Sequence, residues 1–301
     1  GSKVVTITAT FSEPMTASPT ISITGEISNA VMTVSTTANV WNYPWTVSTT
    51  TSGIVSATVS GVDIYGKTYA GTDSITFTID NSAPTLTLTD TDSDNLVSAS
   101  NLVTITATFN EAMSSTPTIN ISGQVSSVLM TASSTTSIWV YPWTVNTFNG
   151  QVFATVSGND LSGKAYAGTT SITFTIDNTA PTVTLTDTDA NNIVAGSNVV
   201  TITATFSEAM TATPTINITG EVSNVAMTAS TTASVWIYPW TVSTTTSGIV
   251  SATISGTDLS GISFSGTDSL TFTISQTIYF ENNTCKCPNA TVRSEERCVG
   301  K

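Results

Sequence analysis

The sequence predicts an all-β protein built from three tandem antiparallel β-sandwiches. The first observation behind this prediction is a segment that occurs three times. It begins as "VVTITATFSEPM" at Val4, as "LVTITATFNEAM" at Leu102 and as "VVTITATFSEAM" at Val199, at offsets of 98 and 97 residues. A fixed period of this length indicates a repeat architecture in which each copy is one folding unit.

The second observation is the alternation of apolar and polar residues within each copy. Val5, Ile7 and Ala9 alternate with threonines, which is typical of a half-buried strand in an antiparallel sheet. The same pattern occurs at Ile21/Ile23, Trp41/Tyr43/Trp45/Val47, Val55/Ala57/Val59 and Ile75/Phe77/Ile79. Turn signals such as Ser60-Gly61 separate these runs, and no segment has a sustained helical period.

The number of strands identifies the type of sandwich. With a further strand at 85–89, the second repeat has about seven strands in about 98 residues, which fits an immunoglobulin-like sandwich. We expect domains at 1–80 (without its first strand), 81–177 and 178–275, followed by a Cys-containing tail at 276–301. The linkers "TIDNSAPT" and "TIDNTAPT" are short and contain proline, so we expect an extended, semi-rigid rod.

Composition excludes several functions. The chain has 7 basic and 20 acidic residues and a net charge of −13, whereas nucleic-acid binding needs a basic surface. It has no histidine, so His-based triads and His metal ligands are excluded, and we expect no enzymatic activity. No run approaches about 18 apolar residues, so we expect no membrane insertion within this chain.

The motifs "APTVTLTDTD", "NNIVAGSNVVTITATFSEAM" and "GTDSLTFTI" resemble the bacterial Ig-like repeats of large cell-surface proteins and adhesins. The resemblance covers residues 1 to about 275. It implies an extracellular location on a bacterial surface and a spacer role. The tail resembles the segment that ends Ig-like arrays in some Bacteroidota surface proteins.

Carboxylates are expected to converge where each linker enters the next domain. In this fold the loops after the second and sixth strands lie at that end, beside the linker. The predicted Ca²⁺ ligands are Asp80, Glu111 and Asp160 at one joint, and Asp177, Glu208 and Asp258 at the next. Asp63 and Glu13 occupy the corresponding place in repeat one without an upstream linker, so we expect an incomplete site there. The alternative is that these residues shape turns and lie in solvent.

A second possible Ca²⁺ site lies after the first strand of repeats two and three. Side-chain oxygens alternate there at Asp90, Asp92 and Asp94, and again at Asp187 and Asp189. Alternating oxygens suit a hard cation, but the EF-hand pattern is incomplete, because its central glycine and closing glutamate are missing. Asx turns are the alternative explanation.

The motif W-x-Y-P-W occurs once per repeat. Its tryptophans are Trp41, Trp45, Trp139, Trp143, Trp236 and Trp240. Their spacing places each pair on one strand face, which favours the core, while a surface for glycan binding is the alternative. The proline within the motif indicates an edge strand or a bulge.

The tail contains every cysteine of the chain: Cys285, Cys287 and Cys298. We expect one disulfide that joins Cys298 to either partner and leaves one cysteine over. Repeat one lacks its first strand, and the tail contains strand-like alternation at Ile278 and Phe280. The tail of one copy could therefore add a strand to repeat one of another, which gives a head-to-tail filament.

Two functions follow from these expectations. The first is a structural extracellular stalk or fibre segment, whose partners are neighbouring domains of a longer array or other copies of the chain. The second is an adhesion module that binds a glycan, a protein or another surface ligand through the tryptophan-rich strand or the distal loops.

Overall fold

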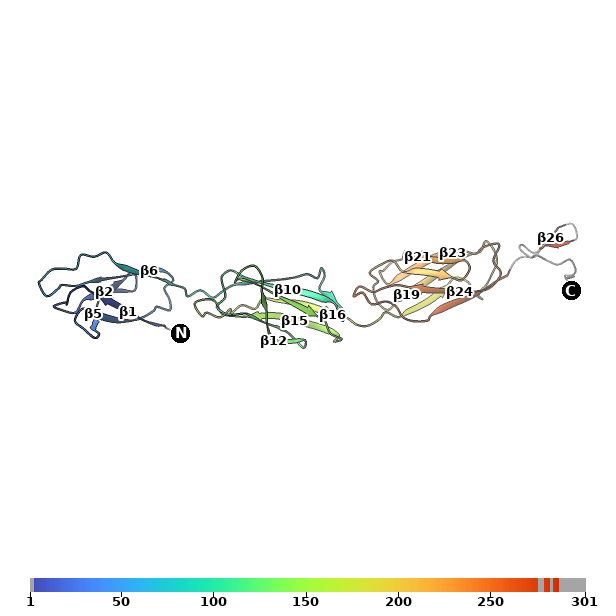
Figure 1. Cartoon of the computed structure of the whole chain (residues 1–301). Coiled ribbons are helices and arrows are strands. Elements are labelled where there is room, and N and C mark those ends of the chain that lie inside the picture. The colour runs from blue at the N-terminus through green and yellow to red at the C-terminus, as the bar shows by residue number, and fades with distance from the viewer. Residues whose placement is uncertain (1–2, 276–278, 282–283, 287–301) are drawn as a thin grey trace.

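The computed structural model describes residues 3–275, 279–281 and 284–286, and these ranges contain β-strands and connecting segments but no helix. Three sandwiches follow one another along a line (Figure 1). The predicted all-β fold of tandem sandwiches is confirmed. Nothing in the described ranges qualifies as a membrane-spanning helix.

Domain one contains the first seven strands. Their bounds are β1 Val4–Thr10, β2 Thr20–Ile23, β3 Ile27–Val31, β4 Thr33–Val34, β5 Val40–Thr46, β6 Gly53–Ser60 and β7 Ser74–Ile79. They form two sheets, with the strand orders β1-β5-β4 and β3-β2-β6-β7.

Domains two and three have nine strands each. Those of domain two are β8 Leu86–Asp90, β9 Leu96–Val97, β10 Leu102–Phe109, β11 Thr118–Ile121, β12 Val125–Leu129, β13 Thr131–Ala132, β14 Ile138–Thr144, β15 Gly150–Ser157 and β16 Ser171–Ile176. Those of domain three are β17 Val183–Asp187, β18 Ile193–Val194, β19 Val199–Phe206, β20 Thr215–Ile218, β21 Val222–Ala226, β22 Thr228–Ala229, β23 Val235–Thr241, β24 Gly248–Ser255 and β25 Ser269–Ile274.

The strand order explains the extra elements of domains two and three. The sheets of domain two are β13-β14-β10-β8 and β12-β11-β15-β16-β9, and domain three repeats both orders. The first strand, β8, pairs antiparallel with β10, and the short β9 then runs parallel to β16. The runs named from the sequence correspond to β8, β10, β11, β14, β15 and β16. Strand β12 is not among them and shows no alternation in burial, and β9 and β13 have two residues each, too few to show a period.

Alternation along the strands builds each core. In β10, Val103, Ile105 and Ala107 are buried, while the threonines between them are more exposed. The indole of Trp143 packs on the ring of Phe174 from the other sheet, with ring centroids 5.2 Å apart. Equivalent pairs in the other domains are Trp45 with Phe77 at 5.2 Å and Trp240 with Phe272 at 5.3 Å. Aromatic packing between the sheets is therefore common to all three domains.

The proline of the tryptophan motif lies where its strand is an edge. Pro142 of β14 pairs with Thr104 of β10 on one side. On the other side, β13 pairs only with Val140 and Trp139 and ends before it reaches the proline. Because proline has no N–H to donate, it fits the side of a strand that lacks a partner.

The tail is described in two short pieces. Strand β26, Tyr279–Glu281, pairs antiparallel with β27, Thr284–Lys286. Cys285 is in β27, whereas Cys287 and Cys298 lie outside the described residues. The predicted disulfide and the predicted donor strand around Ile278 therefore remain predictions.

Candidate metal centre

The linker between domains one and two is tied to domain one by a single asparagine. The backbone N–H of Asn81 donates to Ser52 Oγ at 3.1 Å, and its Nδ2 donates to the carbonyl of Ser48 at 3.1 Å. In the next linker, the N–H of Asn178 donates to Asn149 Oδ1 at 2.8 Å. These bonds fix the chain just after Asp80 and Asp177.

The far end of the same linker is tied to domain two. The N–H of Thr85 donates to Asn110 Oδ1 at 2.7 Å, and the N–H of Asn110 donates back to the carbonyl of Thr85 at 3.2 Å. Thr182 and Ser207 make the equivalent reciprocal pair before domain three. Because Asn110 immediately precedes Glu111, this pairing brings the linker beside the Glu111 loop.

A third carboxylate comes from the loop between β15 and β16. An isolated antiparallel bridge joins Met113 to Asp160, so this loop is paired with the Glu111 loop. Asp160 Oδ1 accepts hydrogen bonds from Ser162 Oγ at 2.7 Å and from the N–H of Lys164 at 2.8 Å. These two donors fix the orientation of the Asp160 carboxylate.

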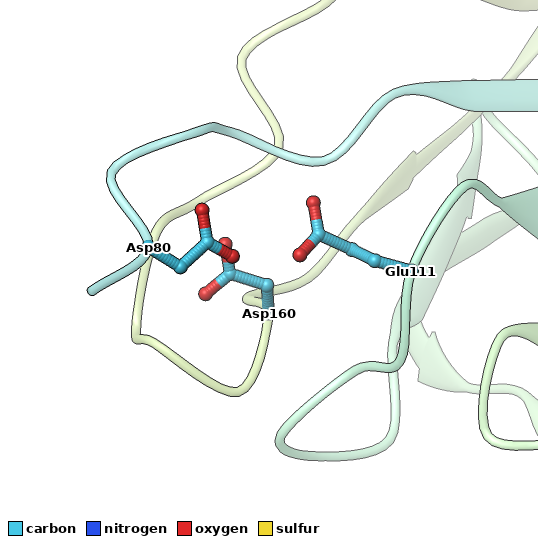
Figure 2. A group of neighbouring side chains, drawn as sticks. All are labelled: Asp80, Glu111 and Asp160. Atoms are coloured by element: carbon cyan, nitrogen blue, oxygen red, sulfur yellow. The ribbon is translucent and has the colours of Figure 1, made fainter. Parts of the chain in front are cut away.

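The three carboxylates meet at the joint, as Figure 2 shows. One oxygen from each of Asp80, Glu111 and Asp160 lies within 4.8 Å of the other two. Asp160 is fully buried, and its Oδ2 has no hydrogen-bond partner. A buried carboxylate oxygen without a partner is costly unless a cation or a donor satisfies it. We call this group joint one.

The electrostatics of joint one reflect this crowding. Partial burial raises the pKa of Glu111, and the nearby negative charges of Asp80 and Asp160 raise it further. The pKa of Asp80 is lowered, mainly because its carboxylate accepts a hydrogen bond from the N–H of Ser82. Glu111 is therefore the carboxyl group of this joint whose ionisation the two neighbouring aspartates disfavour.

Such a group can bind a hard cation. Two oxygens on opposite sides of a Ca²⁺ ion lie about 4.6–5.2 Å apart, given Ca–O distances of about 2.3–2.6 Å. The spread of oxygens at joint one fits within that range. Carboxylate oxygens are ligands for Ca²⁺ or Mg²⁺, whereas zinc sites are usually built with cysteine or histidine.

The corresponding residues Asp177, Glu208 and Asp258 form joint two. Asp258 is fully buried; its Oδ1 accepts from Ser260 Oγ and from the N–H of Ile262, both at 2.8 Å, and its Oδ2 has no partner. Burial, followed by the charges of Asp177 and Asp258, raises the pKa of Glu208. Among the described residues, the 4.8 Å limit is met at joint one and not at joint two, so the carboxylates of joint two are more widely spaced.

Domain one has only part of this arrangement. Met15 bridges to Asp63, and Asp63 Oδ1 accepts from the N–H groups of Tyr65 and Lys67, both at 2.8 Å. The bond from Lys67 is the main reason why the pKa of Asp63 is lowered. Asp63 is only half-buried, in contrast to Asp160 and Asp258.

The other acidic loop has a different geometry. The N–H of Asp92 donates to Asp90 Oδ1 at 2.9 Å, and the N–H of Leu96 donates to Asp94 Oδ1 at 3.1 Å. Asp187 and Asp189 begin the same succession of turns, with the N–H of Asp189 donating to Asp187 Oδ1 at 2.8 Å. These are Asx turns, and within the described ranges their oxygens do not gather into a group of three.

The tryptophans are packed inside the domains. All six, Trp41, Trp45, Trp139, Trp143, Trp236 and Trp240, are buried. This agrees with the core position that the spacing favours, and it leaves no open indole face on which a sugar ring could stack. A binding surface on this chain would have to use other side chains.

Some parts of the joint are absent from the expectations drawn from sequence. The hydroxyl groups of Ser162 and Ser260 donate to the buried aspartates and orient them. A sequence signal for this exists: the run "DLSG" at 160–163 and 258–261 contains the serine, whereas the equivalent run "DIYG" at 63–66 does not. Residue 164, a lysine beside joint one, is also absent from those expectations.

Comparison with known proteins identifies the fold. No protein-family model matches the chain, and no curated protein matches it. Its structure is similar to that of a 1.5-MDa bacterial ice-binding adhesin, with 20% identity, a TM-score of 0.53 and 91% of each chain covered.

Two further solved structures share lower similarity. A tetra-tandem repeat from the extending region of a large adhesion protein has 20% identity and a TM-score of 0.34, covering 89% of this chain and 70% of that one. The fibronectin(III)-like modules of Clostridium thermocellum CbhA have 16% identity and a TM-score of 0.35, covering 64% of this chain and 95% of theirs. The similarity to the ice-binding adhesin agrees with the tandem Ig-like fold of this chain.

Proposed function

We propose that this chain is a stalk segment of an extracellular bacterial surface protein of the adhesin type, and that it separates whatever lies at its two ends. The observation that supports this most is the serial arrangement of the three domains (Figure 1). Each linker is hydrogen-bonded to the domain before it and to the domain after it. The adhesin-like fold and the net charge of −13 fit a soluble spacer.

The stalk is stiffened by a divalent cation, Ca²⁺ in an extracellular setting, at the joints. Without a cation, the linker carboxylate repels the two carboxylates of the next domain. With a cation, the same three groups bind one centre and cross-link the linker to that domain. The unpartnered oxygens of Asp160 and Asp258 are the groups that would gain most.

Small-angle X-ray scattering tests both the stalk and its stiffening by a cation. In Ca²⁺ the full chain should give the profile of a long, narrow particle, and a chelator should shorten the longest distances as the joints bend. Asp80→Asn together with Asp177→Asn should remove the effect of Ca²⁺, because the amide keeps the turn but loses the charge. Asp268→Asn, at an exposed aspartate that belongs to neither group of three carboxylates, is the matched control.

Two results would contradict these ideas. A compact particle under all conditions rules out the stalk. An elongated particle whose profile is the same in Ca²⁺ and in chelator leaves the stalk but rules out stiffening by the cation.

A second candidate function is assembly by strand addition. In domain one the outer edge of β1 has no pairing partner among the described residues, whereas β8 and β17 occupy that edge in the other two domains. A groove there is lined by apolar side chains, among them Ile7, Phe11 and Ile75. A strand from the tail of another copy would complete the sheet and join chains head to tail.

Electron microscopy over a concentration series tests this candidate. Filaments that disappear when residues 276–301 are removed would support strand addition. Single rods at every concentration would exclude it, without affecting the stalk.

A further inference from the structure

The two joints differ at one position. Lys164 and Ile262 are equivalent: the N–H of each donates at 2.8 Å to Oδ1 of the buried aspartate of its joint. The backbone therefore makes the same contact at both joints, and only the side chain differs. Lys164 is also the one basic residue of the sequence between positions 68 and 285.

The charge of Lys164 acts on joint one. Lys164 lines the same cavity as Asp80 and Asn81, between the end of domain one and the β15–β16 loop of domain two. Its ammonium group also contributes to lowering the pKa of Asp80. Joint one thus consists of three carboxylates with a positive charge nearby, whereas joint two has three carboxylates beside an isoleucine.

The spacing of the carboxylates agrees with this difference in charge. The oxygens of joint one lie within 4.8 Å of one another, but those of joint two do not. Partial neutralisation by Lys164 allows like charges to approach, and joint two has no such neutralisation. Joint two therefore keeps more uncompensated negative charge, which favours the binding of a cation.

We propose that the difference between Lys164 at joint one and Ile262 at joint two gives the two joints different affinities for Ca²⁺, so that joint two binds Ca²⁺ more tightly and is occupied first. This rests on the proposed function, in which both joints bind a divalent cation. An ammonium group repels Ca²⁺ at joint one. At a separation of several ångströms and with partial screening, one charge changes the affinity by about threefold to tenfold.

Calorimetric titration with Ca²⁺ can measure each joint in the full chain. Asp80→Asn leaves joint two as the intact site, and Asp177→Asn leaves joint one. We expect the Asp80→Asn chain to bind Ca²⁺ about threefold to tenfold more tightly than the Asp177→Asn chain. Adding Lys164→Ile to the Asp177→Asn chain should remove most of that difference, and adding Ile262→Lys to the Asp80→Asn chain should weaken its binding.

Salt provides an independent check. Because screening weakens the repulsion between Lys164 and Ca²⁺, the effect of Lys164→Ile should shrink as the KCl concentration rises. Lys67→Ile is the matched control: it removes a lysine from the equivalent loop of domain one, and neither joint should respond to it.

The outcomes separate the two proposals. Equal affinities at the two joints, or a Lys164→Ile variant that binds Ca²⁺ no more tightly, would overturn the unequal-joint proposal while leaving cation binding intact. Tighter binding by the original Lys164 chain would also overturn it, because lysine would then help to assemble the site. No binding of Ca²⁺ by the unmodified chain would overturn cation binding itself, and with it this inference.

Discussion

Domains one and two have nearly the same sequence in one strand, β1 in domain one and β10 in domain two, but bury it differently. Val103 and Ala107 of β10 are 2% and 0% exposed, whereas the equivalent Val5 and Ala9 of β1 are only half-buried. The strand that makes the difference is β8, which pairs with β10 and has no counterpart beside β1 in the described residues. Burial of a strand residue is therefore set by neighbouring strands as much as by its own sequence.

The opposite sheet is affected in the same way. Phe174 of β16 is fully buried, while Phe77 of β7 remains partly exposed. Ile75 is exposed, whereas its equivalent Ile172 is half-buried. The aromatic pair at the centre of the sandwich keeps its 5.2 Å spacing in both domains. The centre of the fold thus tolerates the loss of an edge strand, and the cost falls on the side chains near that edge.

Truncation of this phenylalanine should give the largest difference in stability loss between domains one and two. Phe174→Ala should destabilise domain two by about 3–5 kcal/mol, as expected for a large buried aromatic residue. Phe77→Ala should cost domain one roughly half as much, because its ring is already partly in water. Hydrogen-exchange mass spectrometry reads the opening free energy domain by domain.

Phe153→Ala is the control for this comparison, since Phe153 of β15 is 46% exposed and should cost below about 1 kcal/mol. Equal losses for Phe174→Ala and Phe77→Ala would show that the edge strand does not govern the core.

Supplying the missing strand should bring domain one closer to domain two. A copy of residues 81–101 placed directly before Val4, in place of residues 1–3, should slow exchange in β1 and β7 and stabilise domain one by roughly 2 kcal/mol, the effect of burying leucines at the β8 position. The same fusion with Leu86→Ser and Leu88→Ser should have little effect. If both fusions protect domain one equally, chain length and not strand packing is the cause.

The smallest expected difference in stability concerns a glutamate that accepts hydrogen bonds beside the core tryptophan of domain three and its equivalent in domain one. In domain three, Glu221 Oε2 accepts from Trp240 Nε1 at 3.2 Å and from the N–H of Ser243 at 2.9 Å. In domain one, Glu26 accepts from the N–H of Ser48 at 3.3 Å, while the Nε1 of Trp45 has no partner.

Glu221→Ala should therefore cost about 1–2 kcal/mol and Glu26→Ala about half of that, since fewer donors lose their acceptor. Chemical unfolding followed by tryptophan emission compares the two variants. A larger loss for Glu26→Ala would mean that the hydrogen bond to the indole contributes little.

Much of the fold is predictable because its signals are periodic. The alternation of valine, isoleucine and alanine with threonine defines β10, and the repeat offset places its equivalents β1 and β19. Strand β9 is not predictable in this way, because Leu96 and Val97 are too few to show a period and their partner β16 lies about 80 residues away in the sequence.

The candidate site was predictable for a topological reason. Asp80, Glu111 and Asp160 are distant in sequence, but in this sandwich the linker and two loops share one end, and the structure brings the three together. For Asp90 and Asp92 the sequence allowed both a metal site and Asx turns, because both use oxygens at alternate positions. In the structure the N–H of Asp92 donates to Asp90 Oδ1, which forms the Asx turn, and a metal site at this loop stays a prediction.

The parallel pairing of β9 with β16 has a consequence for a chain that is pulled from both ends. The N–H groups of Thr175 and Asp177 donate to the carbonyls of Asn95 and Val97, at 2.8 and 2.9 Å. Because β9 follows the first strand of domain two and β16 is its last, tension drags the two in opposite directions along their length. These bonds are then loaded in shear and must break together, so domains two and three should resist traction longer than domain one, which lacks this pairing in its described residues.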